Sequence, residues 1–142
     1  MGIKLTGDQM QYITLFENIT GARVLDCVVS ENPNRVVFVV KKGDMSMAIG
    51  RKGFNVKKVS SMIGRDVEVI EHADDPKEFI AKLISPARVQ GIRIVEGEDR
   101  RTAYVSVHPR DRGIAIGRDG STIQKVKLLS KRHHRIDNVV IV

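Results

Sequence analysis

The first part of the chain opens with a helical pattern of hydrophobic positions. Ile13, Phe16 and Ile19 recur at helical spacing, and Gly21 follows them at a position where a helix can end. This pattern predicts a helix over residues 8–19.

Two valine-rich runs come next, over residues 24–29 and 35–41, and a turn-forming segment over residues 31–34 joins them. The run over residues 36–40 is apolar on both faces, whereas a strand with one solvent-exposed face alternates between apolar and polar residues. We therefore expect two paired strands, of which the second lies in the middle of its sheet.

A short helix, a glycine loop, a longer helix and a last strand complete this half. Asp44 stands where its carboxylate can cap the short helix, which ends at Ile49. The longer helix covers residues 54–63 and ends at Gly64, and a strand covers residues 66–71. The expected inward face of the longer helix consists of Val56, Val59 and Ile63.

The second half repeats the same order of elements. Its first helix starts at Asp75 and Pro76, with Glu78 placed for a capping box, and ends at Pro86. The other expected elements are strands over residues 91–95 and 101–107, a short helix capped by Asp111, a helix over residues 121–130 and a strand over residues 138–142. We predict an α+β protein of two tandem α-β-β-α-α-β units, residues 1–72 and 73–142. In each unit, helices pack on one face of a three-stranded sheet.

The two halves also match residue by residue. The segment AIGRKG, with glycines at 50 and 53, returns as AIGRDG, with glycines at 117 and 120, at an offset of 67 residues. At that offset no gap is needed until after the helix that follows the loop. The upstream matches are Val40 with Val107, Leu25 with Ile92, Cys27 with Ile94, Ile13 with Ile80 and Phe16 with Leu83. A single Gly-x-x-Gly is weak, but two with shared flanks indicate a duplication.

Composition narrows the functional class. The chain has 142 residues, 42% of them hydrophobic, and no apolar run approaches the length of a membrane span. The net charge is +7 and the pI is near 9.8, which favours a polyanionic partner. The N-terminus does not resemble a secretory signal, and the single cysteine, Cys27, lies in an apolar run. We expect a cytoplasmic protein with Cys27 buried and reduced.

The first glycine loop has the chemistry of a phosphate-backbone site. Gly50 and Gly53 carry no side chains, so a sugar-phosphate strand can approach the loop closely. Free N–H groups at the start of the next helix, together with the helix dipole, favour negative charge there. Arg51 and Lys52 lie between the glycines and supply cations. We expect Lys57 and Lys58 to extend this basic rim.

The second loop, Gly117 to Gly120, keeps Arg118 but places Asp119 where the first loop has Lys52. A carboxylate repels phosphate, so we expect weaker contact with the backbone from this loop. Nearby Lys125, Arg110 and Arg112 compensate in part.

Aromatic stacking contributes little to this prediction. The chain has no tryptophan, two tyrosines and four phenylalanines. Phe16, Phe38 and Phe79 fall in apolar patterns and are expected in the core, which leaves Phe54, after the first loop, as the candidate for exposure. We expect aliphatic grooves, lined by residues such as Ile49 and Ile116, to hold the bases.

Catalytic and metal motifs are absent from the sequence. It has no nucleotide-binding P-loop, no His-Glu-x-x-His and no paired cysteines. His133 and His134 are adjacent, so on a helix they point in different directions, and we interpret them as a basic, solvated helix end. His72 and His108 are interpreted as structural. We predict no enzyme activity, no metal, no cofactor and no small-molecule substrate.

The loops IGRKG with Val56 and IGRDG with Ile123 resemble KH-domain signatures, and the helix ahead of each strand pair resembles the type II arrangement. The tandem pair, with residues 79–81 and 85–87 leading into the second unit, is similar to the KH pair of the NusA family. Only about 20 residues precede the first strand, so the chain resembles the short archaeal form of that family.

This resemblance implies single-stranded RNA binding through both loops and a role in transcription elongation and termination, with RNA polymerase as a candidate partner. Two other interpretations stay open. KH units also occur in ribosomal and ribosome-assembly proteins. One copy, with the Asp119 loop as the better candidate, can instead bind protein.

Overall fold

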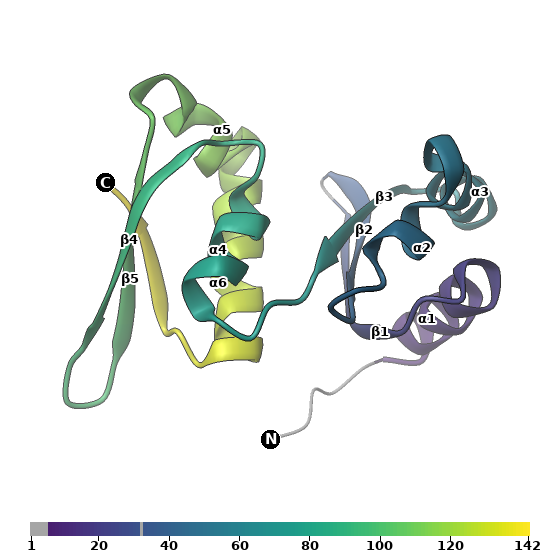
Figure 1. The fold of residues 1–142 in the computed structure, drawn as a ribbon, viewed down its shortest axis with the longest axis horizontal. Helices are drawn as coiled ribbons and strands as arrows, with labels where there is room; N and C mark the ends of the chain where they lie inside the picture. Colours follow the sequence, from purple (N-terminus) through teal and green to yellow (C-terminus); the bar gives the residue numbers. More distant parts are fainter. Residues whose placement is uncertain (1–5, 32) are drawn as a thin grey trace. The chain divides into compact units, whose positions relative to one another are not determined.

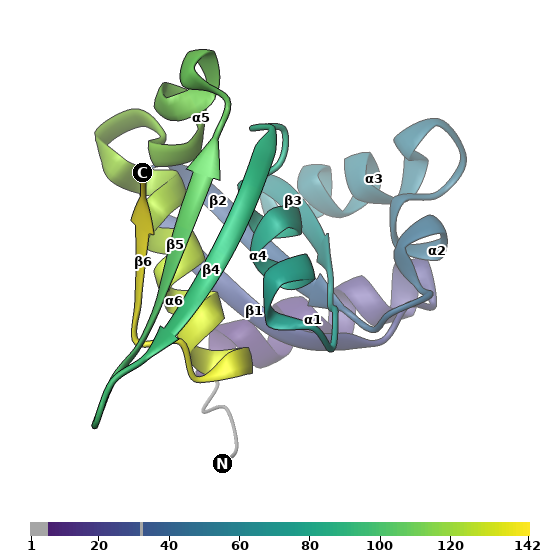
Figure 2. The same cartoon turned by 60° about the vertical axis from the view of Figure 1, so that its left-hand side comes forward.

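The computed structural model describes residues 6–31 and 33–142, which divide into two compact units between His72 and Ala73. Figure 1 and Figure 2 show that each unit has a layer of helices on one face of its sheet. In this part of the chain no helix is long and apolar enough to cross a membrane.

The first unit follows the predicted order. Its elements are α1 (Gly7–Thr20), β1 (Val24–Glu31), β2 (Asn34–Val40), α2 (Met45–Ile49), η1 (Arg51–Gly53), α3 (Phe54–Ile63) and β3 (Asp66–Glu71). The sheet order is β1-β2-β3, with β1 antiparallel and β3 parallel to β2. The apolar run therefore does lie in the central strand, and Val36 to Val40 are all buried.

The second unit has the same topology. Its elements are α4 (Pro76–Ile84), β4 (Val89–Glu96), β5 (Arg101–Val107), η2 (Pro109–Asp111), α5 (Arg112–Ile116), η3 (Arg118–Gly120), α6 (Ser121–His134) and β6 (Asn138–Ile141). β4 pairs antiparallel and β6 parallel with the central strand β5. The prediction of an α+β fold with this element order is confirmed.

The core of the first unit forms between α1, α3 and the helix-facing side of the sheet. Phe16 of α1 stacks on Phe38 of β2, with ring centroids 4.3 Å apart, and Val59 of α3 is fully buried beside them. Thr6 and Gln9 form a capping box at the start of α1, and Gly21 ends this helix in a left-handed conformation. Helix α1 thereby has a defined start and end. Cys27 is buried in this core, as expected.

The gap-free alignment of the two halves is wrong upstream of the central strands. Cys27 pairs with Phe38 in the first sheet, and the equivalent pair in the second sheet is Ile92 with Val105. Phe38 and Val105 are 67 residues apart, but Cys27 and Ile92 are only 65 apart. The two-residue difference lies in the hairpin, which has a longer connection between β4 and β5 than between β1 and β2. Cys27 therefore matches Ile92 and not Ile94.

The expected role of Asp44 and Asp111 as side-chain caps is also wrong. Both stand at the N-cap positions of α2 and α5, but neither side chain accepts a bond from its own helix. The Asp44 carboxylate accepts from the backbone N–H of Arg23 at 2.9 Å, and that of Asp111 accepts from the N–H of Arg88 at 2.8 Å. Each aspartate thus ties the start of its short helix to the start of the neighbouring strand.

The two histidines at the end of α6 are not a solvated helix end. Both are half-buried, and their rings lie 5.4 Å (His133) and 5.2 Å (His134) from the ring of Phe79 in α4. His134 Nε2 is also 2.8 Å from the carbonyl oxygen of Ala73. These rings therefore join α6 to α4, and α6 runs four residues further than the sequence predicted.

Candidate nucleic-acid interface

The first glycine loop is a tight bend between α2 and α3. Gly50 has φ 76° and ψ 174°, a region that is essentially restricted to glycine. Lys52 (φ 54°) and Gly53 (φ 75°) are left-handed. The N–H of Gly53 donates to the Gly50 carbonyl oxygen at 3.1 Å and closes the turn. Arg51 and Lys52 are both exposed on this bend.

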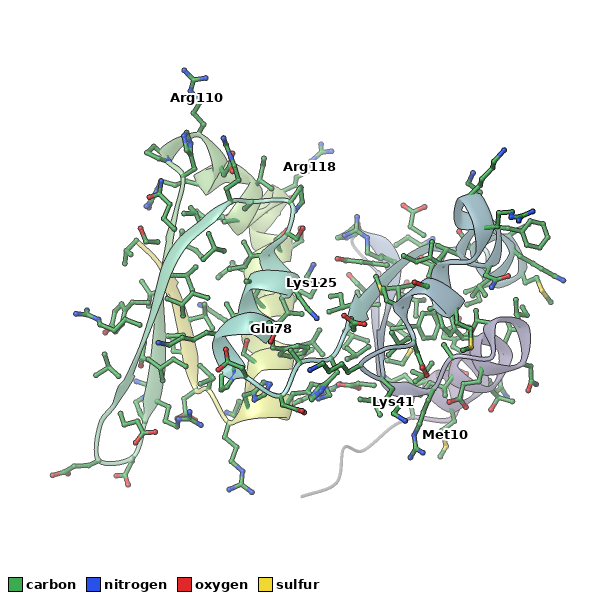
Figure 3. All side chains as sticks on the ribbon, viewed as in Figure 1. Met10, Lys41, Glu78, Arg110, Arg118 and Lys125 are labelled. Atoms are coloured by element: carbon green, nitrogen blue, oxygen red, sulfur yellow. The ribbon has the colours of Figure 1, made fainter. Side chains whose placement is uncertain are left out.

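The second loop repeats this geometry. Gly117 has φ 81° and ψ 167°, Asp119 has φ 54° and Gly120 has φ 75°. The Gly120 N–H donates to the Gly117 carbonyl oxygen at 3.1 Å. Arg118 is exposed, and Figure 3 shows its side chain extending away from the body of the second unit. The two loops differ in side chains and not in backbone.

The second residue of the helix that follows each loop, Asn55 or Thr122, lies close to the first glycine of that loop. Asn55 Nδ2 donates to the Met47 carbonyl oxygen at 2.9 Å and so connects α3 to α2 across the bend. A Cβ on Gly50 would lie 2.7 Å from the Asn55 side chain, and one on Gly117 would lie 2.4 Å from the Thr122 hydroxyl. The first glycine of each loop is therefore required by both space and backbone conformation.

The expectation of free amides at the start of the following helix needs correction. The first two amides are already used inside the bend: Gly53 donates to Gly50, and the Phe54 N–H donates to the Arg51 carbonyl oxygen. Gly53 occupies the N-cap position of α3 and has no side chain, so the next two amides, of Asn55 and Val56, receive no side-chain cap. The positive end of α3 therefore begins at Asn55.

A groove of about 370 Å³ runs beside the first loop, between the helices and the edge strand β3. Its lining residues are Met45, Ile49, Gly53, Val56, Lys57, Val67, Glu68 and Val69. It continues along α3 and β3 into a second hollow of about 640 Å³ with a more polar lining, which adds Arg35, Ser60, Ser61 and Asp66. An apolar floor with a cationic rim suits a flat, partly polar ring attached to a phosphate.

The structure brings most of the predicted residues of the first unit to this place. Ile49, Gly53 and Lys57 line the groove, and Gly50, Arg51 and Lys52 form the loop at its end. Lys58 is exposed on α3 but is not among the lining residues. Val56, expected to face inward, lines the groove instead.

In the second unit the predicted residues lie around the equivalent bend. Ile116 is 39% exposed at the end of α5, and Gly117, Arg118, Asp119 and Gly120 form the loop. Lys125 is half-buried on α6. Figure 3 shows Arg110 extending outward near the same end of the unit.

Sequence reasoning missed the strand side of the groove. Val67 and Val69 of β3 lie beside the loop, and Glu68 carries an ion pair of 3.5 Å to Arg35 of β2. These residues belong to a strand whose position depends on parallel pairing with β2. The sequence shows the alternation of polar and apolar residues in β3, but it does not show that this strand borders the groove.

A salt bridge holds the start of α5, the short helix that leads into the second loop. Arg88 binds the Asp111 carboxylate through its backbone N–H (2.8 Å), its Nε (2.8 Å) and an Nη (3.2 Å). These bonds, led by that from the guanidinium, lower the pKa of Asp111 from 3.8 to about 2. Asp111 precedes α5, so the pair fixes the helix that carries Ile116 to the start of β4.

Among residues 6–31 and 33–142, no group of three or more His, Cys, Asp or Glu side chains is arranged to hold a metal ion. His108 accepts the backbone N–H of Arg110 at 3.1 Å, consistent with a structural role. The four phenylalanines divide as expected: Phe16, Phe38 and Phe79 are fully buried, while Phe54 is 64% exposed.

Comparison with known protein families agrees with this geometry. Residues 10–74 match the KH domain, and residues 76–137 match the NusA-like second KH domain. The fold and the paired glycine loops thus define a tandem KH protein, as the sequence motifs indicated.

Individual relatives identify the family more closely. The chain is 38% identical over 139 residues to the "Probable transcription termination protein NusA" of Halococcus morrhuae, covering 98% of both chains. It is 34% identical to the protein of the same name from Methanococcus vannielii, covering 100% of this chain and 81% of that one. The chain belongs to the NusA family and corresponds to its short archaeal form.

Two further matches extend the comparison. The "Transcription termination/antitermination protein NusA" of Thermus thermophilus is 36% identical over 112 residues, which cover 78% of this chain and 26% of that protein. The solved structure "Crystal structure of APE1850" has a TM-score of 0.83 and 29% identity, covering 97% of this chain and 100% of that one. The tandem KH fold therefore has a close counterpart among solved structures.

Proposed function

We propose that this protein binds single-stranded RNA through both glycine loops and acts in transcription elongation and termination. The observation that carries the proposal is the groove of the first unit, which joins an apolar floor to a side-chain-poor, cationic bend. The names of the relatives, which describe transcription termination proteins, favour transcription over ribosome assembly.

The sugar-phosphate backbone would lie across the bend. Gly50 and Gly53 allow phosphates to approach the main chain, Arg51 and Lys52 neutralise them, and the uncapped start of α3 adds a positive helix end. Lys57 then faces the same strand from the groove side. Contacts to phosphate give affinity and register without reading sequence.

The bases would enter the groove, where two kinds of contact are available. Ile49, Val56 and Val69 offer apolar surface to the faces of the rings. β3 is the edge strand of its sheet and pairs with β2 on one side only, so its other side presents backbone N–H and C=O groups that can pair with base edges. KH modules clamp about four nucleotides, so the two units together would cover roughly eight to ten.

The two loops would contribute unequally. Asp119 occupies the place of Lys52 in the same conformation, and its carboxylate opposes phosphate binding. We infer that the first loop provides most of the affinity, with Arg118 as the main cation of the second. In this proposal the protein has no catalytic step, and RNA polymerase is its candidate protein partner.

A titration of RNA tests the proposal directly. Fluorescence anisotropy with a labelled decanucleotide should show saturable binding that weakens steeply with salt, and Lys52→Asp should weaken it more than Arg118→Asp does. Retrieval of RNA polymerase and untranslated RNA from cell extract would support the transcription role. Absence of RNA binding at low salt by the folded protein would refute the proposal, and retrieval of ribosomal particles alone would refute its transcription part.

A further inference from the structure

An exposed aromatic ring stands directly beside the first glycine loop. Phe54 is the first residue of α3, immediately after Gly53, and 64% of it is exposed. The other three phenylalanines of the chain are fully buried. Phe54 therefore contributes little to the core, and it presents a flat apolar face to solvent beside the bend that the proposed RNA strand would cross.

The neighbours of this ring are cationic. On a helix, residues three and four positions apart are neighbours on the surface, so Phe54 is next to Lys57 and Lys58. Lys57 lines the groove, whereas Phe54 and Lys58 lie outside its lining. Both lysines are exposed. The ring thus borders the rim of the groove, between one lysine that faces the groove and one that faces away from it.

We propose that Phe54 stacks a nucleobase outside the groove and so adds one nucleotide to the segment held by the first unit, with Lys57 and Lys58 neutralising the phosphates on either side of that nucleotide. This inference rests on the proposed RNA-binding function. Stacking on an aromatic ring is tolerant of sequence because every base has a π-face. The subsite therefore adds affinity and length and does not select a base.

The second unit provides an internal comparison. At the offset of 67 residues that holds through the loop and the start of the following helix, Phe54 corresponds to Ser121 and Lys57 to Gln124. The second bend keeps its glycines but has no ring at this position. The stacking subsite is consequently a property of the first unit alone.

The absence of tryptophan from the chain makes a spectroscopic test possible. Phe54→Trp introduces a single fluorophore at the subsite, and Met62→Trp, at a 58% exposed position two turns along the same helix, is the matched control. Titration with a hexanucleotide should quench the fluorophore at position 54 strongly and the one at position 62 weakly. Unchanged fluorescence at position 54 while anisotropy reports bound RNA would overturn the inference.

Affinity measurements with RNAs of different length complete the test. They use the full chain with Arg118→Asp, so that binding by the first unit dominates. Phe54→Ala should weaken binding of a hexanucleotide by roughly 5- to 150-fold, the effect expected for one stacked base, and binding of a tetranucleotide much less. Phe54→Leu keeps an apolar side chain without a π-face and should show a similar loss.

The outcomes separate the two proposals. If the Phe54→Leu variant binds the hexanucleotide as tightly as the protein with Phe54 does, the stacking subsite is wrong although RNA binding stands. The same conclusion follows if loss of the ring weakens binding of the hexanucleotide and of the tetranucleotide equally. Ser121→Phe should lengthen the segment held by the second loop in the otherwise unaltered chain, and failure to do so would also count against the inference. Absence of binding by every variant and by the unaltered protein would instead refute the proposed function.

Discussion

Lys52 and Asp119 share one backbone conformation, with φ 54° and ψ 27°, at equivalent points of the two loops, yet they carry opposite charges. Both stand between two glycines on a bend closed by the same hydrogen bond. Because the backbones agree so closely, a difference in RNA affinity between the loops should come from the side chains. Substitutions at positions 52 and 119 can therefore change the charge of either loop without changing its backbone conformation.

The first prediction concerns the charge of the second loop. Asp119→Lys should strengthen RNA binding and steepen its salt dependence, by about 0.7 in the log–log slope for each added phosphate contact, and Asp119→Asn should do so less. Lys52→Asp should have the opposite effect. Anisotropy titrations over a range of salt concentrations measure both quantities.

Glu98→Lys serves as the control for this prediction. It makes the same change in net charge in the connection between β4 and β5, which Figure 1 shows at the opposite end of the second unit from α5. If Glu98→Lys raises affinity as much as Asp119→Lys, the effect is one of overall charge and the second loop does not contact phosphate.

The second prediction concerns the two glycines within one loop. Gly117 has a conformation essentially restricted to glycine, and an added Cβ would lie 2.6 Å from the backbone nitrogen of Thr122. At Gly120 the nearest atom would be 3.8 Å away, so Gly120→Ala incurs only left-handed strain of about 1–2 kcal/mol. Urea unfolding followed by circular dichroism should show a larger loss of stability for Gly117→Ala. Equal losses would contradict the close approach.

The order of elements was predictable because local signals agree with the tertiary structure. α3 and β3 begin and end where expected, since Gly53 and Gly64 limit the helix and a polar residue starts the strand. The buried centre of β2 followed from its unbroken run of valine and phenylalanine. The glycine loops could be predicted because the same Gly-x-x-Gly motif occurs in register in both halves of the repeat.

Two of the errors have a common cause, since each involves a partner distant in sequence. Asp44 was expected to cap its own helix, but its carboxylate reaches the N–H of Arg23, 21 residues away. The strand wall of the groove, including Val67 and Val69, depends on how β3 pairs with β2. The two-residue shift between Cys27 and Ile92 arises in a hairpin connection, where local patterns are weakest.

The third prediction concerns Asn55, whose amide bonds the Met47 carbonyl oxygen at 2.9 Å across the first bend. Asn55→Ala removes that bond and should lower the free energy of unfolding by about 1 kcal/mol. It also removes the two nearest atoms that a Cβ on Gly50 would meet, the Asn55 Cγ at 2.7 Å and Nδ2 at 2.8 Å, but leaves the Cβ of residue 55 at 3.0 Å. It should therefore relieve part of the cost of Gly50→Ala in the double variant. Denaturant unfolding of the two single variants and the double variant measures this coupling, and strictly additive losses would show that Asn55 does not restrict Gly50.

The fourth prediction concerns acid stability and the ion pair of Asp111 with Arg88. The pKa of Asp111 falls to about 2 in the folded protein, against 3.8 as its ordinary value. The unfolded chain therefore binds this proton more readily, so the contribution of the pair is complete above about pH 4 and disappears as the pH falls toward 2.

Asp111→Asn keeps an acceptor for the Arg88 N–H but removes the charge. This variant should have a lower urea midpoint than the unaltered protein at pH 7 and the same midpoint near pH 2. Arg88→Gln should remove the larger part of this pH dependence, because it removes the guanidinium but keeps the backbone N–H that donates to Asp111. Combining it with Asp111→Asn should add little. A midpoint difference that persists unchanged from pH 7 to pH 2 would show that the charge on Asp111 does not stabilise the second unit.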